Sequence, residues 1–431
     1  MEHVNANVGL DKIPFSPSYS GVISLADGRL MWMWGAGGVT GPATAMYSED
    51  EGQTWGEPAL VKLTTGEPLK YVYETSLFRL PSGAIGLIMT HEQYRRPAYG
   101  VQAFCRSDDE GQTWSPPKQI DPENASSYQN DSVTVLRDGR IILAVYTSVR
   151  PKPIDPDVTS VTRLGEQFHS AEGGTLAFSY TYYSDDEGKT WQRSRNQTLV
   201  MRDKGALGFF SMGEPTVIEL NDGRLMMYGR VNLGRIYESY SDDRGETWTE
   251  AIPTNLAAYP CPRNLKRIPK TGDLLLIWNQ LSRWEAMHGL FRHRLTCAIS
   301  RDEGKTWTQR RNLESLDDVT TIEPDGEDLL MIRGARQPAD RQRYHRAPGP
   351  LRYNDATCAF FGDDKVIITY CMLGLGDPDE LKANFGMDID KVAQKWGFSK
   401  HPKHGSPKVP PSKWWSGAHR VRVLSTDWFY Q

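Results

Sequence analysis

Six segments of the chain share one pattern of apolar and polar positions. In each, a β-prone apolar run is followed by a Gly/Asp turn and a second apolar run, which is the pattern of a β-hairpin. The segments read VISLADGRLMWMW, TSLFRLPSGAIGLIM, SVTVLRDGRIILAVY, TVIELNDGRLMMYG, NLKRIPKTGDLLLIW and ATCAFFGDDKVIITY. Six hairpins spread along one chain predict an all-β repeat architecture.

An octapeptide of pattern S-x-D-x-G-x-T-W follows five of these hairpins. Its copies end at Trp55, Trp114, Trp191, Trp248 and Trp307. The Ser and Asp side chains accept backbone N–H bonds, the Gly takes positive φ, and the Trp buries a large apolar surface. We therefore interpret the box as a structural joint and not as five catalytic sites. Hairpin and box together give about four strands per unit, which predicts a six-bladed β-propeller of four-stranded antiparallel blades.

Residues 1–431 are expected to form a single propeller domain. The interval between Trp114 and Trp191 is the longest, which places an insertion at about residues 150–176, long enough to act as a lid. The sixth hairpin has no box. Instead, residues 419–430 predict a C-terminal strand that joins the first-formed sheet and closes the ring.

The composition limits the classes of partner. With 39% hydrophobic residues, 24% charged residues and a formal net charge of −4, the chain is typical of a soluble protein and does not suggest nucleic-acid binding. Its apolar runs are shorter than the roughly 20 residues of a membrane helix. Its start lacks a signal-peptide core, so we expect a cytoplasmic protein or an exported one whose signal has been removed. The oligomeric state stays open.

Cysteine and histidine do not follow the spacing of known metal or disulfide motifs. The five cysteines are scattered and the nine histidines are dispersed. We therefore expect no disulfide framework, no metal and no cofactor.

Candidate chemistry gathers at the start of the first strand of each hairpin. In a propeller these strands line the central axis, so that their first residues meet around one site. The positions hold Ser18, Tyr19, Tyr73, Glu74, Asn130, Asp131, Glu214, Arg263, Tyr353, Asn354 and Asp355. This concentration of carboxylates and hydroxyls predicts a functional site on the axis.

The box resembles the Asp-box, or BNR repeat, of the sialidase (neuraminidase) superfamily, from about residue 15 to the end of the chain. The resemblance implies a six-bladed propeller that acts on a carbohydrate. The stretch EPTVIELNDGRLMMYGR is similar to the family segment in which a Glu opens a strand and an Arg follows on the return strand, here Glu214 and Arg230. YNDATCAFFGDDKVIITY is similar to the segment that holds the nucleophilic Tyr, here Tyr353.

These matches imply an exo-glycosidase that releases a terminal acidic sugar with retention. A phenol with its ordinary pKa of about 10 is a weak nucleophile, so Glu214 would take the proton of Tyr353. Arg230 would bind the sugar carboxylate with its planar fork. A further substrate-binding arginine is expected before the fifth box, at Arg292 or Arg294.

The first blade departs from the family pattern. SPSYSGVISLADGRL lacks the arginine of the family's R-I-P motif, and MWGAGGVTGPATAMYSEDEG carries no carboxylate before its box, where the family has its acid/base Asp. We expect neighbouring blades to supply replacements: Asp131 as a catalytic carboxyl, with Glu74 and His91 in substrate binding. Loop arginines at Arg95, Arg96 and Arg150 would add positive charge.

Two other functions stay open. One is a lyase or hydrolase acting on uronic acids, with His91 or a Tyr as base and an Arg neutralising the carboxylate. The other is a carbohydrate-binding propeller without catalysis, whose aromatic side chains stack on sugar. The presence of both Glu214 and Tyr353 argues against this last function.

Overall fold

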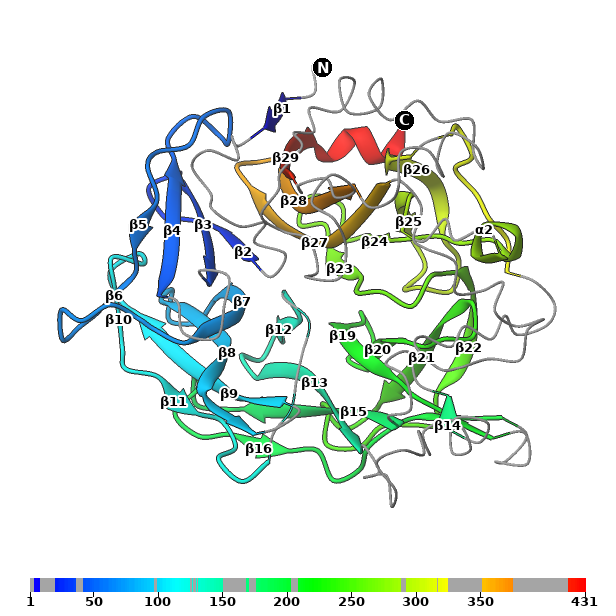
Figure 1. The fold of residues 1–431 in the computed structure, drawn as a ribbon, viewed down its shortest axis with the longest axis horizontal. Coiled ribbons are helices and arrows are strands. Elements are labelled where there is room, and N and C mark those ends of the chain that lie inside the picture. Colours follow the sequence, from blue (N-terminus) through cyan, green and yellow to red (C-terminus); the bar gives the residue numbers. More distant parts are fainter. Residues whose placement is uncertain are drawn as a thin grey trace, which may run out of the picture.

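In the computed structural model, six four-stranded antiparallel sheets surround one axis (Figure 1). The inner strand of each blade contacts the inner strand of the next, and the last inner strand contacts the first, so the ring is closed. The structure describes residues 4–7, 20–35, 42–96, 99–124, 126, 129, 131–149, 168–169, 176–202, 208–287, 292–315, 317–324, 351–374 and 418–431. The predicted six-bladed propeller is confirmed.

In each of the first three blades, the four strands lie in chain order from the axis outward. Blade one contains β2 (Ser20–Ser24), β3 (Leu30–Gly35), β4 (Ala43–Ser48) and β5 (Ala59–Leu60). Blade two contains β7 (Val72–Arg79), β8 (Ile85–Arg96), β9 (Tyr99–Ser107) and β11 (Lys118–Gln119). Blade three contains β12 (Val133–Val135), β13 (Ile141–Val149), β15 (Leu176–Ser184) and β16 (Gln192–Arg193).

Blades four and five repeat this order, whereas the outermost strand of blade six is the N-terminal strand. Blade four contains β19 (Gly213–Glu219), β20 (Leu225–Arg230), β21 (Arg235–Ser241) and β22 (Ile252–Ala257). Blade five contains β23 (Asn264–Arg267), β24 (Leu274–Trp278), β25 (Leu295–Ser300) and β26 (Thr308–Glu314). Blade six contains β27 (Leu351–Phe361), β28 (Lys365–Gly374), β29 (Ala418–Ser425) and β1 (Val4–Asn7).

Short elements lie outside the blades. They are the parallel pair β6 (Lys62–Leu63) and β10 (Thr113–Trp114), the sheet of β14 (Phe168–His169), β18 (Phe209–Phe210) and β17 (Val200–Met201), the helix α2 (Arg283–Met287) and the 3₁₀ helix η4 (Thr426–Tyr430). Within the described part of the chain, no helix has the length and apolar character needed to cross a bilayer.

Both ends of the chain meet in blade six. Strand β29 pairs with β28 on one side and with β1 on the other, with Val4 opposite Val423. The C-terminal strand therefore differs from our expectation, because it is the third strand of blade six and does not join the first-formed sheet. The N-terminal strand covers its outer edge, which leaves fewer unpaired backbone groups. The insertion expected at residues 150–176 lies outside the described residues, apart from 168–169 and 176.

The box forms a dense turn between the third and fourth strands of its blade. In blade four, the Ser241 hydroxyl donates to Asp243 Oδ1 at 2.8 Å and accepts from the Gly245 N–H at 2.8 Å. Thr247 donates its N–H to Asp243 Oδ1 at 2.7 Å and its hydroxyl to Oδ2 at 2.6 Å. The same bonds recur at Asp50, Asp109, Asp186 and Asp302. The box is thus the structural joint that its residues predict.

The box also joins each blade to the preceding one, which the sequence did not reveal. The residue before its Gly has positive φ in all five copies and reaches the inner hairpin of that preceding blade. Glu110 accepts from the Ala26 N–H at 2.7 Å, Glu187 from that of Ser82 at 2.7 Å, and Glu303 from that of Asn221 at 2.7 Å. Glu51 pairs with Lys365 at 2.5 Å. In blade four the charges are exchanged, with Arg244 2.5 Å from Asp138.

The box glycine also packs against side chains of the preceding blade. A Cβ at Gly188 would lie 2.4 Å from the Phe104 ring, and one at Gly111 would lie 2.8 Å from the Met31 sulfur. Gly188 and Gly111 have φ of 85° and 81°. Any larger residue would therefore strain the turn, and at Gly188 it would also clash with the Phe104 ring.

We expect Asp243→Ala to lower the free energy of unfolding by about 1–3 kcal/mol at neutral pH, because the donors that it accepts lose their partner. Burial alone would raise the pKa of Asp243, but the bonds from Thr247 and Ser241 lower it to about 2. Since the folded-state pKa is depressed, this stabilisation is present above pH ~4 and is lost as the pH falls toward 2. Urea unfolding across this range measures it. Asp242→Ala, at the exposed neighbouring position, is the matched control and should change little.

Candidate functional site

Glu214 and Asp355 occupy corresponding positions in blades four and six. The register of β19 shifts between Gly213 and Thr216, and that of β27 shifts between Asn354 and Thr357. Glu214 has φ of 42° and Asp355 has φ of 55°. Bulges of this kind re-aim side chains, and strained backbone at a strand start is common next to active sites.

Glu214 is paired with Arg230, the residue that we expected to bind the sugar carboxylate. Arg230, at the end of β20, donates an Nη1–H to Glu214 Oε1. The two side chains are only 8% and 14% exposed. Glu214 Oε2 is buried and accepts no hydrogen bond from the described residues. One oxygen of this carboxylate is therefore held in place while the other is left for a ligand or water.

Arg292, which precedes β25 of blade five, lies beside Asp355 of blade six. It has φ of 57° and donates an Nη1–H to Asn354 Oδ1 at 3.0 Å. The same nitrogen lies 3.8 Å from Asp355 Oδ1. Its guanidinium also sits 5.5 Å from the centre of the Tyr259 ring. Of the two candidate arginines before the fifth box, Arg292 is thus the one that lies beside these carboxylates.

Arg263, directly before β23, adds a third guanidinium. Its Nη2 donates to the Cys261 carbonyl at 2.6 Å, whereas its Nη1 is buried and donates to no acceptor within the described residues. Burial lowers the pKa of Arg263 to about 10, although the nearby Glu214 carboxylate acts to raise it. A buried donor without an acceptor is costly, and a bound anion would satisfy it.

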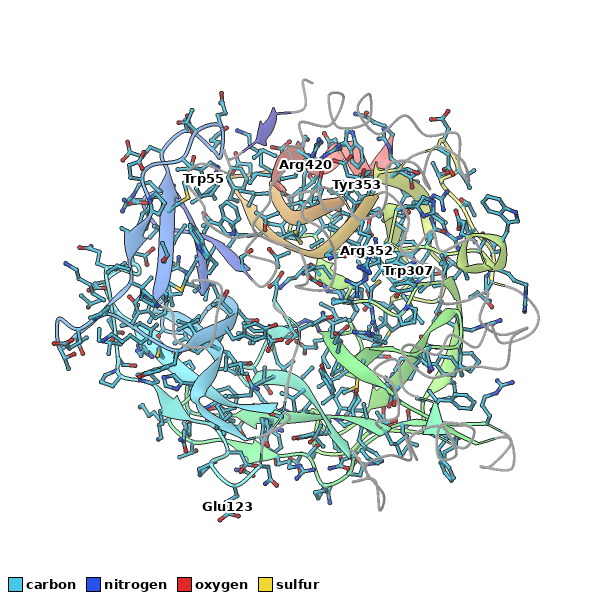
Figure 2. All side chains as sticks on the ribbon, viewed as in Figure 1. Trp55, Glu123, Trp307, Arg352, Tyr353 and Arg420 are labelled. Atoms are coloured by element: carbon cyan, nitrogen blue, oxygen red, sulfur yellow. The ribbon has the colours of Figure 1, made fainter. Side chains whose placement is uncertain are left out.

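The electrostatics of Asp355 reflect all of these neighbours. Burial raises the pKa of Asp355 to about 6, Arg292, Arg230 and Arg352 act to lower it, and the Glu214 charge acts to raise it. Figure 2 shows Arg352 closer to the centre of the ring than Tyr353.

We call these six residues the axial cluster: Glu214, Arg230, Arg263, Arg292, Arg352 and Asp355. Its four guanidinium groups outnumber its two carboxylates. The cluster therefore favours an anionic ligand.

Tyr353 does not lie in the axial cluster. Its side chain is fully buried in the core of blades five and six, with its ring 6.3 Å from that of Tyr370. Burial raises the pKa of Tyr353 well above 10, and the charge of Glu314 adds to this. Its hydroxyl has no hydrogen-bond partner among the described residues, Glu214 included. The reason is strand alternation, since Asn354 faces Arg292 and its neighbour Tyr353 therefore faces the opposite side.

Asp131 serves as a bridge between blades. Its carboxylate accepts from Lys266 Nζ at 2.6 Å, from Asn264 Nδ2 at 2.6 Å and from the Cys358 N–H at 3.2 Å. The donors come from blades five and six, while Asp131 precedes β12 of blade three. Three donors occupy this carboxylate, so the structure does not present it as the catalytic carboxyl we expected.

Arg294 belongs to an ion cluster beside α2, in which Arg294 and Glu285 are buried and Asp317 is exposed. It donates to Glu285 Oε1 at 2.6 Å and to both oxygens of Asp317 at 2.6 Å. Burial alone would raise the pKa of Glu285, but His293 and Arg294 lower it to about 2. Glu285, His293 and Asp317 are residues of metal-binding type, and their ligand atoms lie within 4.8 Å of one another. The Arg294 guanidinium already forms ion pairs with both carboxylates, so we interpret this group as structural.

The two remaining candidates lie in blade two. Glu74 is buried and accepts a hydrogen bond from the Thr90 hydroxyl at 2.6 Å. His91 is buried with its ring 5.7 Å from that of Tyr71. Burial lowers the pKa of His91 to about 4, which makes it a weak base. Ser18, Tyr19, Asn130 and Arg150 lie outside the described residues.

Comparison with known proteins now places the chain in a family. Residues 28–344 match the model of the BNR repeat-like domain. The chain belongs to the BNR repeat-like domain family. This match confirms the resemblance to the BNR repeats of the sialidase superfamily that the sequence shows.

Individual relatives of this BNR repeat-like protein are distant. An anhydrosialidase from Macrobdella decora is 31% identical over 151 residues, which cover 35% of this chain and 16% of the leech protein. A protein of unknown function from Dyadobacter fermentans has a similar structure, with a TM-score of 0.55, 14% identity and 96% of each chain covered. The sialidase of Trypanosoma rangeli gives a TM-score of 0.53 at 13% identity, covering 95% of this chain and 55% of that one. At such identities these structures support the fold alone.

We expect Arg294→Met to lower the free energy of unfolding by about 3–5 kcal/mol, because it leaves Glu285 and Asp317 without their shared cation. Chemical denaturation measures the loss. Arg301→Met, at an exposed arginine of the fifth box, is the control and should change stability little. An equally small effect of Arg294→Met on the free energy of unfolding would show that this ion cluster does not stabilise the protein.

Proposed function

We propose that this protein is a glycoside hydrolase that removes a terminal acidic sugar from a glycan, with the axial cluster as its active site. The supporting observation is the arrangement of four guanidinium groups around two carboxylates at one end of the inner strands. Arg263 Nη1 is a buried donor and Glu214 Oε2 a buried acceptor, and neither has a partner among the described residues. An acidic sugar offers a carboxylate to the first and a hydroxyl to the second.

The charge distribution favours an acidic sugar over a neutral one. Arg230 and Arg292 each have a carboxylate neighbour, whereas Arg263 has none within salt-bridge distance in the described residues. A planar guanidinium binds a carboxylate through two parallel hydrogen bonds. The leech anhydrosialidase and the trypanosomal sialidase, by their names, act on sialic acid compounds, which agrees with this charge.

The role of Tyr353 as nucleophile stays a prediction. In a retaining mechanism its hydroxyl has to reach the anomeric carbon while Glu214 accepts its proton. The buried position of Tyr353 beside Tyr370 does not provide this contact. A tyrosine-based mechanism therefore requires the start of β27 to rearrange when substrate binds.

We expect the wild-type protein to hydrolyse at least one of a set of aryl glycosides of acidic sugars, including sialyl, deaminated sialyl and uronyl donors. Arg263→Met should raise KM by about tenfold or more for the acidic substrate, because the ion pair between Arg263 and the sugar carboxylate is lost. The matched control is Arg301→Met, which removes the same charge at the outer edge of blade five. Activity confined to neutral sugars would contradict the proposal.

Tyr353→Phe separates two mechanisms. If Tyr353 is the nucleophile, the variant should lose about 10²–10⁴-fold in kcat or more, since a covalent step disappears. If its hydroxyl stays in the core, activity should remain near that of the wild type, with a change in melting temperature instead. NMR detection of the first anomer released gives a second readout, because retention of configuration is required by the tyrosine mechanism and inversion excludes it.

A further inference from the structure

We propose that Asp355 is the general acid of this reaction and replaces, from blade six, the carboxylate that the first blade lacks. This inference rests on the proposed glycosidase function. The first blade has no Asp or Glu between its hairpin and its box, so the proton donor has to come from another blade.

The geometry singles out Asp355 among the carboxylates considered for this role. Asp131 is occupied by three donors from blades five and six. Glu74 is bound to Thr90 within blade two. Asp355 lies in the axial cluster itself, 3.8 Å from Arg292, at a bulge that corresponds to that of Glu214.

The positive φ of Asp355 fixes the direction of its side chain. Left-handed backbone costs about 1 kcal/mol or more for a residue other than Gly, with Asn and Asp the most tolerant. At Glu214, where the backbone is also left-handed, the side chain forms the ion pair with Arg230. By the same local geometry, Asp355 reaches Arg292 rather than the core that receives Tyr353.

The surroundings of Asp355 keep it partly protonated. The charged groups that act on it are Arg292 from blade five, Glu214 and Arg230 from blade four, and Arg352 from its own strand. Burial outweighs the three arginines and raises the pKa to about 6. An Asp with an ordinary pKa of about 4 would be almost fully ionised at pH 6. Asp355 can therefore donate a proton under mildly acidic conditions.

The step conserves atoms and charge. Asp355 transfers its proton to the glycosidic oxygen, the bond from the anomeric carbon to that oxygen breaks, and its electron pair stays on the oxygen of the departing alcohol. Water adds its oxygen to the anomeric carbon, and the proton lost by that water returns to the Asp355 carboxylate. Return of this proton to Asp355 requires the retaining route, in which water attacks from the side that the alcohol has left; in an inverting route a second base on the opposite face takes it.

Two substrates with one acidic sugar but different leaving groups test the role of Asp355. The 4-nitrophenolate of a nitrophenyl glycoside leaves without protonation, whereas the alkoxide of an alkyl-linked sugar needs a proton from an acid. We expect Asp355→Asn to reduce kcat/KM, which reports the departure of the leaving group, by about 10²–10⁴-fold on the alkyl-linked substrate and by less than about tenfold on the nitrophenyl one. Asn tolerates left-handed backbone, so the variant should keep its fold, as checked by its melting curve.

The matched control is Asp363→Asn, the same change in the exposed turn of the same hairpin. It should leave both substrates unaffected. In the wild type, kcat/KM for the alkyl-linked substrate should fall as the pH rises through about 6, because Asp355 then loses its proton. No such fall is expected for the nitrophenyl substrate.

The outcomes separate this inference from the proposed function. Equal losses on the two substrates, or no loss, would overturn the role of Asp355 while the glycosidase function stands. A wild-type protein inactive on all acidic glycosides would overturn the function and this inference together. If Asp355→Asn does not fold, the leaving-group dependence of the wild-type pH profile decides, since identical profiles for the two substrates would exclude Asp355 as the acid.

Discussion

The contact between each box and the inner hairpin of the preceding blade is the constraint on which the rest of the structure depends. A four-stranded sheet cannot bury both of its faces alone, so each blade needs a neighbour at a fixed distance. The box glycine lets the turn approach the neighbouring side chains, as Gly188 does at Phe104. The residue before it then caps a backbone N–H of that hairpin, as Glu187 does at Ser82.

This contact joins five of the six pairs of neighbouring blades. The inner strands also contact one another around the whole ring, which brings their first residues together although these residues are far apart in the sequence. Asp131 reinforces the arrangement, since it joins blade three to Lys266 in blade five and to the Cys358 N–H in blade six. The frame therefore both assembles the axial cluster and limits which side chains can enter it.

Burial and charge act against each other in the axial cluster. Removing arginines and carboxylates from water is costly, and only mutual pairing and bound ligand compensate for it. Burial lowers the pKa of Arg263 to about 10 and raises that of Asp355 to about 6. These opposite shifts follow from one cause, since a low-dielectric site disfavours both charged forms. A site tuned in this way can bind an anion and still hold a proton for transfer.

The sequence by itself determined the number of blades, the hairpins, the structural role of the box, and the positions of Glu214 and Arg230 on the two strands of one hairpin. These features depend on local patterns and on spacing within one blade, which a linear chain displays directly. The resemblance of the segment at Tyr353 to a nucleophile-bearing strand was local as well.

Only the tertiary structure decided which neighbouring residue of β27 faces the axis. A strand presents alternate residues to opposite sides. The bulge at Asp355 shifts that alternation, and the local sequence pattern does not predict this bulge. Tyr353 therefore packs in the core while Asp355 meets Arg292. Arg292 and Arg294 also meet carboxylates in different parts of the fold. Residues two apart in a regular strand face the same side, and the left-handed backbone at Arg292 breaks that rule here. Side-chain direction at a strand start depends on register, and register is set by the neighbouring strands.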